Sequence, residues 1–144
     1  MKLSFIKTHP QAQVPLRMSD HASGYDLFAC LEESVILAPM QRMAIPTGIA
    51  MAIPEGFEAQ IRPRSGLALK LGLGILNSPG TIDADYRGEI KVILINLGTE
   101  KVSITPGMRI AQLVFARVEH FSFEQCESLD ETSRNAGGFG HTGE

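Results

Sequence analysis

Glycine and proline interrupt this chain at short intervals, and the apolar runs between them are too short for long helices. The 144 residues include 14 glycines and 8 prolines. Glycines and prolines at this spacing are typical of proteins built from many short strands. Four of the prolines lie at the edge of an apolar run, where a missing N–H disturbs a strand least: Pro39, Pro46, Pro54 and Pro106. The pattern therefore predicts an all-β fold.

Six segments carry strand patterns. Residues 57–62 alternate apolar and polar side chains, which is the period of a half-buried strand. Residues 89–96 and 109–118 are more uniformly apolar and predict strands covered on both faces. The shorter candidates are residues 35–37, 49–53 and 102–104.

Two segments depart from the strand pattern. Residues 65–71 are rich in helix formers behind Ser65, a good N-cap residue, and predict one or two helical turns. Residues 129–144 are polar and Gly-rich, without an apolar period. We therefore predict a β-sandwich or jelly roll with one short helix over residues 1–128, followed by a flexible lid over residues 129–144 of the same domain.

Composition excludes several classes of protein. With 44% hydrophobic residues the chain can build a core without metal or disulfide staples, and its net charge of −3 offers no basic face for nucleic acid. No apolar run approaches the roughly 18–20 residues that span a bilayer. Residues 1–7 lack the apolar stretch of a signal peptide, and Cys30 and Cys126 are expected to stay reduced. These features predict a cytoplasmic domain.

Two segments before the tail carry polar groups suited to chemistry. Arg64, Ser65 and Gly66 precede or open the predicted helix and suit a phosphate cradle, although these residues alone favour a strand-to-helix turn with a solvated Arg. Residues 77–89 form a predicted hairpin in which Asn77 suits an amide-like ligand edge. Asp83 and Asp85 are either a pair for base or metal chemistry, or turn caps, and spacing alone favours turn caps.

The glycine-rich tail surrounds one aromatic side chain with polar groups. Phe139 lies between Arg134 on one side and His141 with Thr142 on the other. This arrangement suits a lid that closes over an aromatic, phosphorylated ligand. The sequence contains no zinc-ligand spacing, no dinucleotide fingerprint and no P-loop.

Taken together, these segments resemble the homotrimeric dUTPase family, whose members hydrolyse dUTP to dUMP and pyrophosphate. Five motifs match in the family's order: residues 22–27 (Ala-Ser-Gly-Tyr-Asp-Leu), 64–68 (Arg-Ser-Gly-Leu-Ala), 77–89, 107–113 (Gly-Met-Arg-Ile-Ala-Gln-Leu) and 134–143. The resemblance implies a jelly roll that forms a three-fold trimer, with each site built from more than one subunit. It also implies an enzyme that lowers dUTP and supplies dUMP.

The resemblance assigns roles to particular residues. Asp83 is implied to be the base that activates water for in-line attack on the α-phosphorus. Mg²⁺ is implied to bridge the triphosphate, with Asp26 ordering water around it. The remaining substrate-binding assignments are Asn77, Thr81, Ile82, Asp83 and Lys91 for uracil, Tyr86 for the deoxyribose, Arg64, Ser65, Gly66 and Gln112 for phosphate, Arg134 for the γ-phosphate, Phe139 for the base, and His141 for phosphate.

Two residues of the tail depart from the family pattern. Asn135 stands where the family usually has Gly, and His141 stands where many members have Ser. Titration of His141 near neutrality would change the number of hydrogen bonds it donates. Three other functions stay open at this stage: a dCTP deaminase, which shares the fold, a binding module without turnover, and a purely structural trimer.

Overall fold

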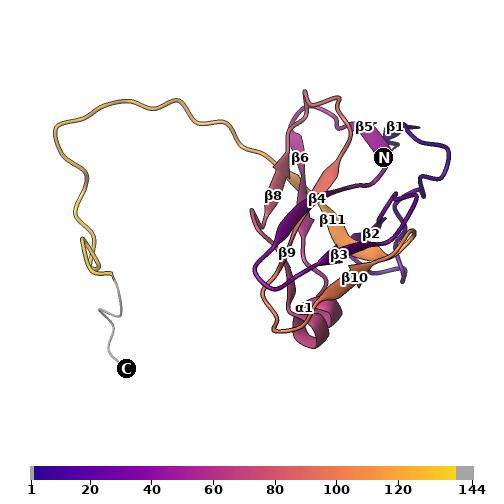
Figure 1. Cartoon of the computed structure of the whole chain (residues 1–144). Coiled ribbons are helices and arrows are strands. Elements are labelled where there is room, and N and C mark those ends of the chain that lie inside the picture. Colours follow the sequence, from indigo (N-terminus) through magenta and orange to yellow (C-terminus); the bar gives the residue numbers. More distant parts are fainter. Residues whose placement is uncertain (1, 139–144) are drawn as a thin grey trace.

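Eleven short strands and one helix make up the fold in this computed structural model, which describes residues 2–138 (Figure 1). Their bounds are β1 Ser4–Lys7, β2 Tyr25–Phe28, β3 Val35–Leu37, β4 Arg42–Pro46, β5 Ile49–Ala52, β6 Phe57–Arg62, α1 Ser65–Leu71, β7 Leu73–Ile75, β8 Gly80–Ile82, β9 Lys91–Asn96, β10 Val102–Ile104 and β11 Arg109–Arg117. The predicted all-β fold with one short helix is confirmed. Within residues 2–138, no helix has the length and apolar character needed to cross a membrane.

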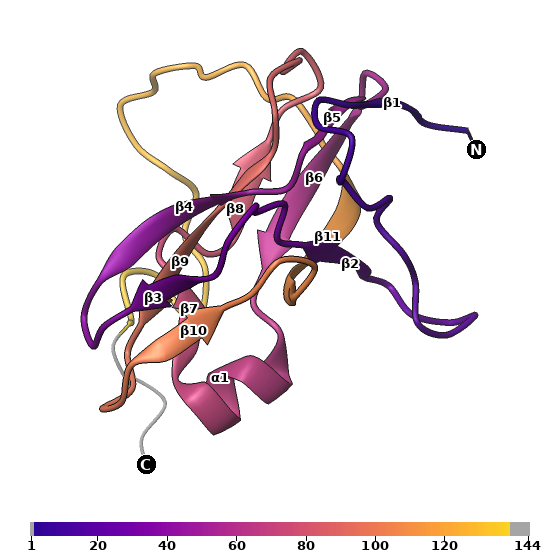
Figure 2. The same ribbon diagram turned by 45° about the vertical axis from the view of Figure 1, so that its right-hand side comes forward.

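The strands pair almost entirely with partners distant in sequence. The largest sheet has the order β2-β11-β6-β8, and a second sheet has the order β4-β9-β7. Strand β1 pairs with β5, and β10 pairs with β3. Every pairing is antiparallel. These small sheets enclose one core, and Figure 2 shows them wrapped around each other as in a jelly roll.

Alternation of side chains explains how the sheets bury their inner faces. In β6, Ala59 and Ile61 are buried, whereas Arg62 is exposed. In β9, the side chain of Asn96 is fully buried at the end of the strand. Its amide nitrogen donates to the carbonyls of Leu37 (2.9 Å) and Glu100 (2.7 Å), so the buried polar group is satisfied.

The predicted strands match the observed ones, with small differences at their ends. Strands β3, β6 and β10 have the predicted bounds, while the other three predicted segments are one or two residues shorter. The sequence did not predict β1, β2, β4, β7 or β8. The N-cap prediction was wrong, because Arg64 occupies that position and Ser65 is the first helical residue. Gly72 ends α1 in the left-handed region, with φ of 66°.

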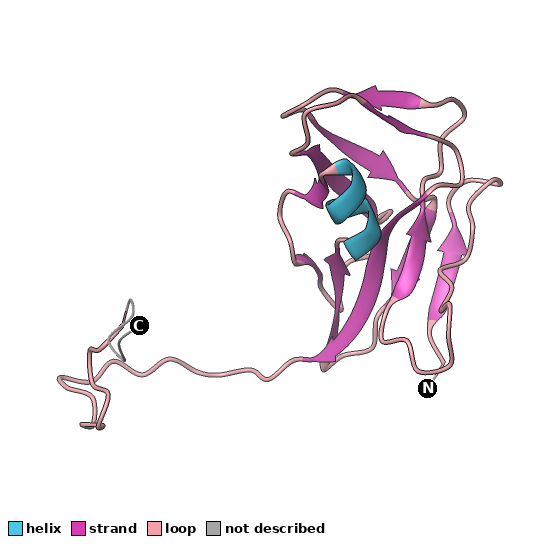
Figure 3. Cartoon of the chain, turned by 90° about the horizontal axis from the view of Figure 1, so that it is seen from below, coloured by secondary structure: helices cyan, strands magenta, loops and turns pink. Residues whose placement is uncertain are grey.

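The segment after β11 leaves the body of the molecule as an extended arm (Figures 1 and 3). Its last backbone bond to the body runs from Val118 N to Gly56 O at 3.1 Å. Residues 119–138 contain no strand or helix. The irregular segment thus begins before residue 129, where the composition changes.

Candidate active site

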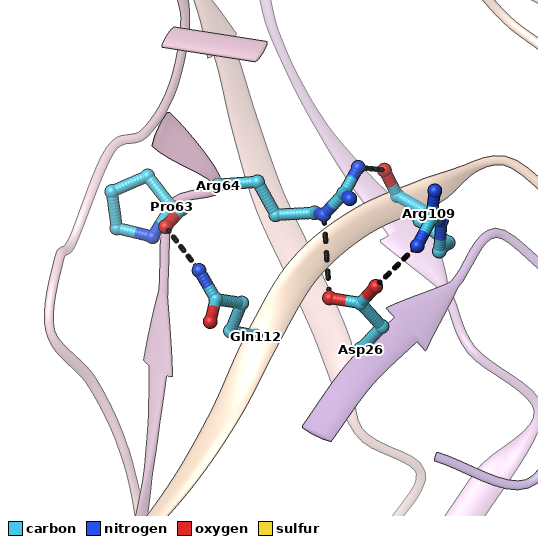
Figure 4. Close-up of polar contacts among 5 residues, drawn as sticks. All are labelled: Asp26, Pro63, Arg64, Arg109 and Gln112. Carbon is cyan, nitrogen blue, oxygen red and sulfur yellow. Dashed lines mark hydrogen bonds and ion pairs between the residues drawn. The ribbon is translucent and has the colours of Figure 1, made fainter. Parts of the chain in front are cut away.

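A buried carboxylate on the edge strand of the four-stranded sheet joins two arginines (Figure 4). Asp26 lies on β2 and is 6% exposed. One of its oxygens lies 3.3 Å from Arg64 Nε, and the other lies 3.1 Å from Arg109 Nη1. Arg64 arrives from the turn before α1, and Arg109 begins β11 beside a register shift between Arg109 and Ala111. We call Asp26, Arg64 and Arg109 the arginine cluster.

Further contacts connect this cluster to Gln112. Arg64 Nη1 donates to the carbonyl of Arg109 at 3.2 Å, and Gln112 Nε2 donates to the carbonyl of Pro63 at 3.3 Å. Gln112 lies opposite Asp26 in the β2–β11 ladder. Gly24 leaves room for it, since a Cβ there would lie 3.2 Å from Gln112 Cβ.

The start of α1 presents the other residues expected to bind phosphate. Ser65 and Gly66 are exposed, and open space surrounds the position of a Cβ on Gly66. The amides of Leu67 and Ala68 both donate to Arg64 O. The two preceding N–H groups have no partner within the helix and are free to meet an anion. The structure therefore brings Arg64, Ser65, Gly66 and Gln112 to one end of the body.

The hairpin that contains Asp83 borders an open pocket of about 540 Å³, which β4 and β9 also line. Its lining consists of Ala44, Thr81, Ile82, Asp83, Tyr86, Glu89, Lys91 and Ile93. Five residues predicted to bind substrate therefore lie together. Asn77 lies beside the start of β8, because a Cβ on Gly80 would be 3.2 Å from Asn77 Nδ2.

Tyr86 is fixed at the rim of this hairpin pocket. Its hydroxyl donates to the carbonyl of Glu89 at 3.0 Å, and its amide donates to the carbonyl of Asp83 at 3.2 Å. The ring lies against Gly88, where a Cβ would be 2.6 Å from Tyr86 Cζ. Gly88 is therefore a positioning residue for Tyr86 that sequence reasoning missed.

Asp83 presents an unpaired carboxylate. Within residues 2–138, the side chains of Asp83 and Asp85 accept no hydrogen bond and form no ion pair, so neither caps a turn as spacing alone had favoured. Asp83 is exposed and also lines a second pocket, together with Glu55, Glu58 and His120. Its carboxylate is thus accessible to a water molecule or a ligand.

The hairpin pocket and the arginine cluster are separate on one chain, because Ile82 of β8 lies opposite Ala59 whereas Arg64 follows the other end of β6 at Arg62. Figures 1 and 2 both place the loop between β8 and β9 at the top of the body and α1 at the bottom. No residue of the arginine cluster lines the hairpin pocket. One chain therefore does not bring Asp83 and Arg64 together.

Only part of the predicted lid lies within the described residues. Thr132 and Asn135 exchange two hydrogen bonds: Thr132 N donates to Asn135 Oδ1 (2.8 Å), and Asn135 N donates to Thr132 Oγ1 (3.0 Å). Asn135 has φ of 42°, a left-handed conformation that Asn tolerates, which explains how it replaces Gly. Phe139 and His141 lie outside the described residues.

The donor set determines how a metal could be held. Within residues 2–138, no group of three or more His, Cys, Asp or Glu side chains is arranged to hold a metal ion. Each oxygen of Asp26 already faces a guanidinium, but carboxylate oxygens have further lone pairs. The residues therefore fit an ion held mainly by a bound triphosphate, with Asp26 reaching it through water.

Comparison with known proteins identifies the family. The family model described as dUTPase matches residues 10–143. The chain belongs to the dUTPase family. It is 56% identical to a deoxyuridine 5'-triphosphate nucleotidohydrolase of Syntrophotalea carbinolica over 99% of both chains. It is also 56% identical to the protein of that name from Wolinella succinogenes, over 99% of this chain and 95% of the relative.

Solved dUTPases share the fold. The Staphylococcus bacteriophage 80alpha dUTPase, solved with dUPNHPP, has a TM-score of 0.90 and 28% identity over 99% of this chain and 98% of the phage chain. A variant dUTPase of S. aureus phage phi11, described as coordinating a structural Mg(II) ion, has a TM-score of 0.81 and 26% identity over 89% and 98% of the two chains. The predicted family is thus confirmed, and the dCTP deaminase alternative is set aside.

Proposed function

We propose that the chain hydrolyses dUTP to dUMP and pyrophosphate, thereby lowering dUTP and supplying dUMP. The observation that carries this proposal is the hairpin pocket, which places the unpaired carboxylate of Asp83 beside the anchored ring of Tyr86. Its volume of about 540 Å³ suits a nucleoside. Membership of the dUTPase family supports the same substrate.

The pocket selects the base and the sugar. Asn77, Lys91 and the main chain of residues 81–83 pair with the uracil edge. Cytosine presents a donor where uracil presents an acceptor, and each buried group left unpaired costs about 1–3 kcal/mol. The ring of Tyr86 occupies the space that a 2′-hydroxyl would need, and thus favours deoxyribose.

The chain's own residues carry out the hydrolysis. Asp83 accepts a proton from water, whose oxygen forms a bond to the α-phosphorus as the bond to the pyrophosphate oxygen breaks. Arg64, Ser65, Gly66 and Gln112 hold the phosphates, Arg134 meets the γ-phosphate, and Phe139 and His141 close the lid. A Mg²⁺ ion on the triphosphate would neutralise charge on the leaving group, with Asp26 contacting it through water.

We further propose a homotrimer in which each site takes the hairpin pocket from one copy and the arginine cluster from another. Their separation within one chain supports this arrangement. Helix α1 contains no buried residue in the isolated chain, and Leu69 and Leu97 are 89% and 60% exposed. A second copy covering these side chains would remove apolar surface from water.

Nucleotide hydrolysis tests the substrate and the base. Pyrophosphate release is measured with Mg²⁺ from dUTP, dCTP, dTTP and UTP, with ammonia assayed in the dCTP reaction. We expect release from dUTP alone; ammonia would revive the deaminase, and no turnover would favour a binding module. Asp83→Asn is expected to keep dUTP binding and lose most of kcat, and near-normal turnover would remove Asp83 as the base.

Mixed assemblies test the shared site. Asp83→Asn damages the hairpin pocket and Arg64→Gln damages the arginine cluster. Because each site needs both parts intact, each variant alone is expected to be inactive. When the two are unfolded and refolded together, an Arg64→Gln chain supplies an intact pocket and an Asp83→Asn chain an intact cluster. Random assembly restores about a quarter of the sites. A mixture as inactive as its components would contradict the shared site.

A further inference from the structure

The segment just before β9 is fastened to the residues that follow β4. The amide and the hydroxyl of Thr47 both donate to the carbonyl of Ile90, at 3.3 Å and 2.7 Å. The amide of Ile90 donates to the carbonyl of Ile49 at 2.8 Å, and the amide of Gly48 donates to Oε1 of Glu89, also at 2.8 Å. These hydrogen bonds fix Glu89 and Ile90 to Thr47, Gly48 and Ile49, which we call the anchoring turn.

Packing holds the anchoring turn in place. Thr47 is 1% exposed. Gly48 has φ of 67°, and a Cβ on it would lie 2.6 Å from Ala12 Cβ and 2.9 Å from Cys30 Sγ. Its carbonyl accepts a hydrogen bond from Thr8 N at 2.8 Å. Only glycine suits a position that is both left-handed and closely packed, so the turn has little freedom to move.

The peptide group between Glu89 and Ile90 connects the anchoring turn to Tyr86. The N–H and the C=O of a trans peptide group point in opposite directions within one plane. On one side the N–H of Ile90 donates to the anchoring turn, and on the other the C=O of Glu89 accepts the hydroxyl of Tyr86 at 3.0 Å. The side chain of Glu89 adds a second attachment to the turn, which opposes rotation of this peptide group.

We propose that Glu89 is a positioning residue for Tyr86: its carboxylate holds the anchoring turn and thereby fixes the carbonyl that accepts the tyrosine hydroxyl. This inference rests on the proposed function, in which the ring of Tyr86 favours deoxyribose. Tyr86, Arg87 and Gly88 are all exposed, whereas Glu89 is half-buried. The ring therefore depends on an attachment at the protected end of its loop, and a hydrogen bond to a carboxylate is stronger than one between neutral groups.

Two plainer explanations lead to different outcomes. If the carboxylate only stabilises the fold, its loss lowers the melting temperature and leaves substrate preference unchanged. If it contacts the nucleotide, as its place in the lining of the hairpin pocket allows, glutamine changes KM as much as alanine does. Under the proposal, glutamine preserves the function of Glu89, because its amide oxygen also accepts a hydrogen bond from Gly48.

The ratio of kcat/KM for dUTP to that for UTP separates the three explanations. We expect Glu89→Ala to lower this ratio about five-fold, because a hydrogen bond to a charged group is lost, and Glu89→Gln to stay within about two-fold of the unmodified protein. An unchanged ratio in Glu89→Ala, or a glutamine variant as altered as the alanine variant, would overturn the proposal.

Glu33→Ala is the matched control for the loss of charge. Glu33 is exposed in the loop between β2 and β3, and its side chain forms no hydrogen bond or ion pair within residues 2–138. We expect its ratio to stay within about two-fold of the unmodified protein. A control that falls as far as Glu89→Ala would show that net charge causes the effect, and would overturn the proposal.

A double-mutant cycle shows whether the effect passes through the hydroxyl of Tyr86. Tyr86→Phe removes this hydroxyl and keeps the ring. In that background Glu89→Ala should change the ratio by less than about two-fold, because the group that Glu89 positions is already absent. The same fold-change in both backgrounds would overturn the proposal.

Tyrosine NMR signals give a readout that needs no turnover. The chain has two tyrosines and no tryptophan, so ring-labelled tyrosine gives two sets of signals, which Tyr86→Phe assigns. We expect Glu89→Ala to shift the Tyr86 signals and to leave those of Tyr25 in place. Unmoved Tyr86 signals would overturn the inference. Absence of dUTP hydrolysis by the unmodified protein would instead refute the proposed function, and the NMR comparison would still test this inference.

Thermal unfolding shows whether each variant folds. If Glu89→Ala does not, Glu89→Asp replaces it, because aspartate keeps the charge but is one methylene shorter and cannot hold the amide of Gly48 in the same geometry. We expect Glu89→Asp to lower the ratio and to shift the Tyr86 signals in the same direction. An aspartate variant that matches the unmodified protein in both measurements would overturn the proposal.

Discussion

Replacing Gly88 with alanine should weaken discrimination between dUTP and UTP without changing Tyr86 itself. A Cβ at this position would lie 2.6 Å from Tyr86 Cζ, whereas nonbonded carbons pack at about 3.5–4.0 Å. The ring must therefore recede by about 1 Å, and its hydroxyl loses the 3.0 Å bond to Glu89 O. If Tyr86 excludes a 2′-hydroxyl as proposed, the displaced ring no longer occupies the position from which it does so.

The magnitude follows from two contributions. The hydrogen bond from Tyr86 contributes about 0.5–1.5 kcal/mol, and forcing an extra atom into a packed site costs about 1–3 kcal/mol. If the displaced ring removes half of the steric cost that a 2′-hydroxyl would meet, and the hydrogen bond from Tyr86 is also lost, discrimination between dUTP and UTP changes about tenfold. We therefore expect the ratio of kcat/KM for dUTP to that for UTP to fall about tenfold or more in Gly88→Ala.

The assay is steady-state pyrophosphate release with each nucleotide, and Gly74→Ala is its control. A Cβ on Gly74 would lie 3.6 Å from Ile95 Cγ2, an ordinary contact outside the hairpin pocket, so the ratio should not change. Tyr86→Ala serves as the upper limit of the effect. If Tyr86→Ala abolishes discrimination and Gly88→Ala leaves it intact, the ring tolerates the added methyl and the steric reasoning is refuted.

Four other predictions concern the arm and the cysteines. Deleting residues 134–144 should leave the melting temperature unchanged and abolish efficient dUTP hydrolysis, because the described part of this segment bonds only within the arm; full activity would refute the lid. Asn135→Ala should raise KM about five-fold over Asn135→Gly, since a left-handed alanine costs about 1 kcal/mol; equal KM values would argue against this turn. Burial, followed by the Glu89 carboxylate, raises the pKa of the Cys30 thiol, so mass spectrometry should find iodoacetamide on the exposed Cys126 first. The same shift lowers the free energy of unfolding as pH rises above the ordinary thiol pKa, which denaturant titrations at pH about 8 and 10 would measure.

Local sequence patterns predicted those strands in which the pattern of apolar side chains matches the pattern of burial. Residues 57–62 alternate in sequence and in the structure, because one face of β6 packs into the core. Strands β7 and β8 have three residues each, and each includes a glycine, so no period is visible in them. Their strand conformation comes from pairing with β9 and β6, which a local pattern cannot reveal.

A similar limit applies to the candidate site, because sequence reasoning proposes individual residues and does not show which distant residues meet. Resemblance to five motifs supplied Asp26, Asp83, Tyr86 and Gln112 as individual residues. It gave no role to Arg109, whose partner Asp26 is 83 positions away, because that contact depends on the pairing of β2 with β11. Gly88 was missed for a different reason: its value lies in the side chain it lacks.

The separation of the hairpin pocket from the arginine cluster keeps the exposed carboxylate of Asp83 from pairing with Arg64 within one chain. A carboxylate held close to Arg64 in the isolated chain would form an ion pair and be unavailable to take a proton from water. Within residues 2–138, Asp26 instead pairs with the two arginines, and the side chain of Asp83 has no partner. If assembly then brings Asp83 toward the arginine cluster of another copy, the bound triphosphate lies between them. The phosphates occupy the arginines, and the carboxylate stays free to act as the base.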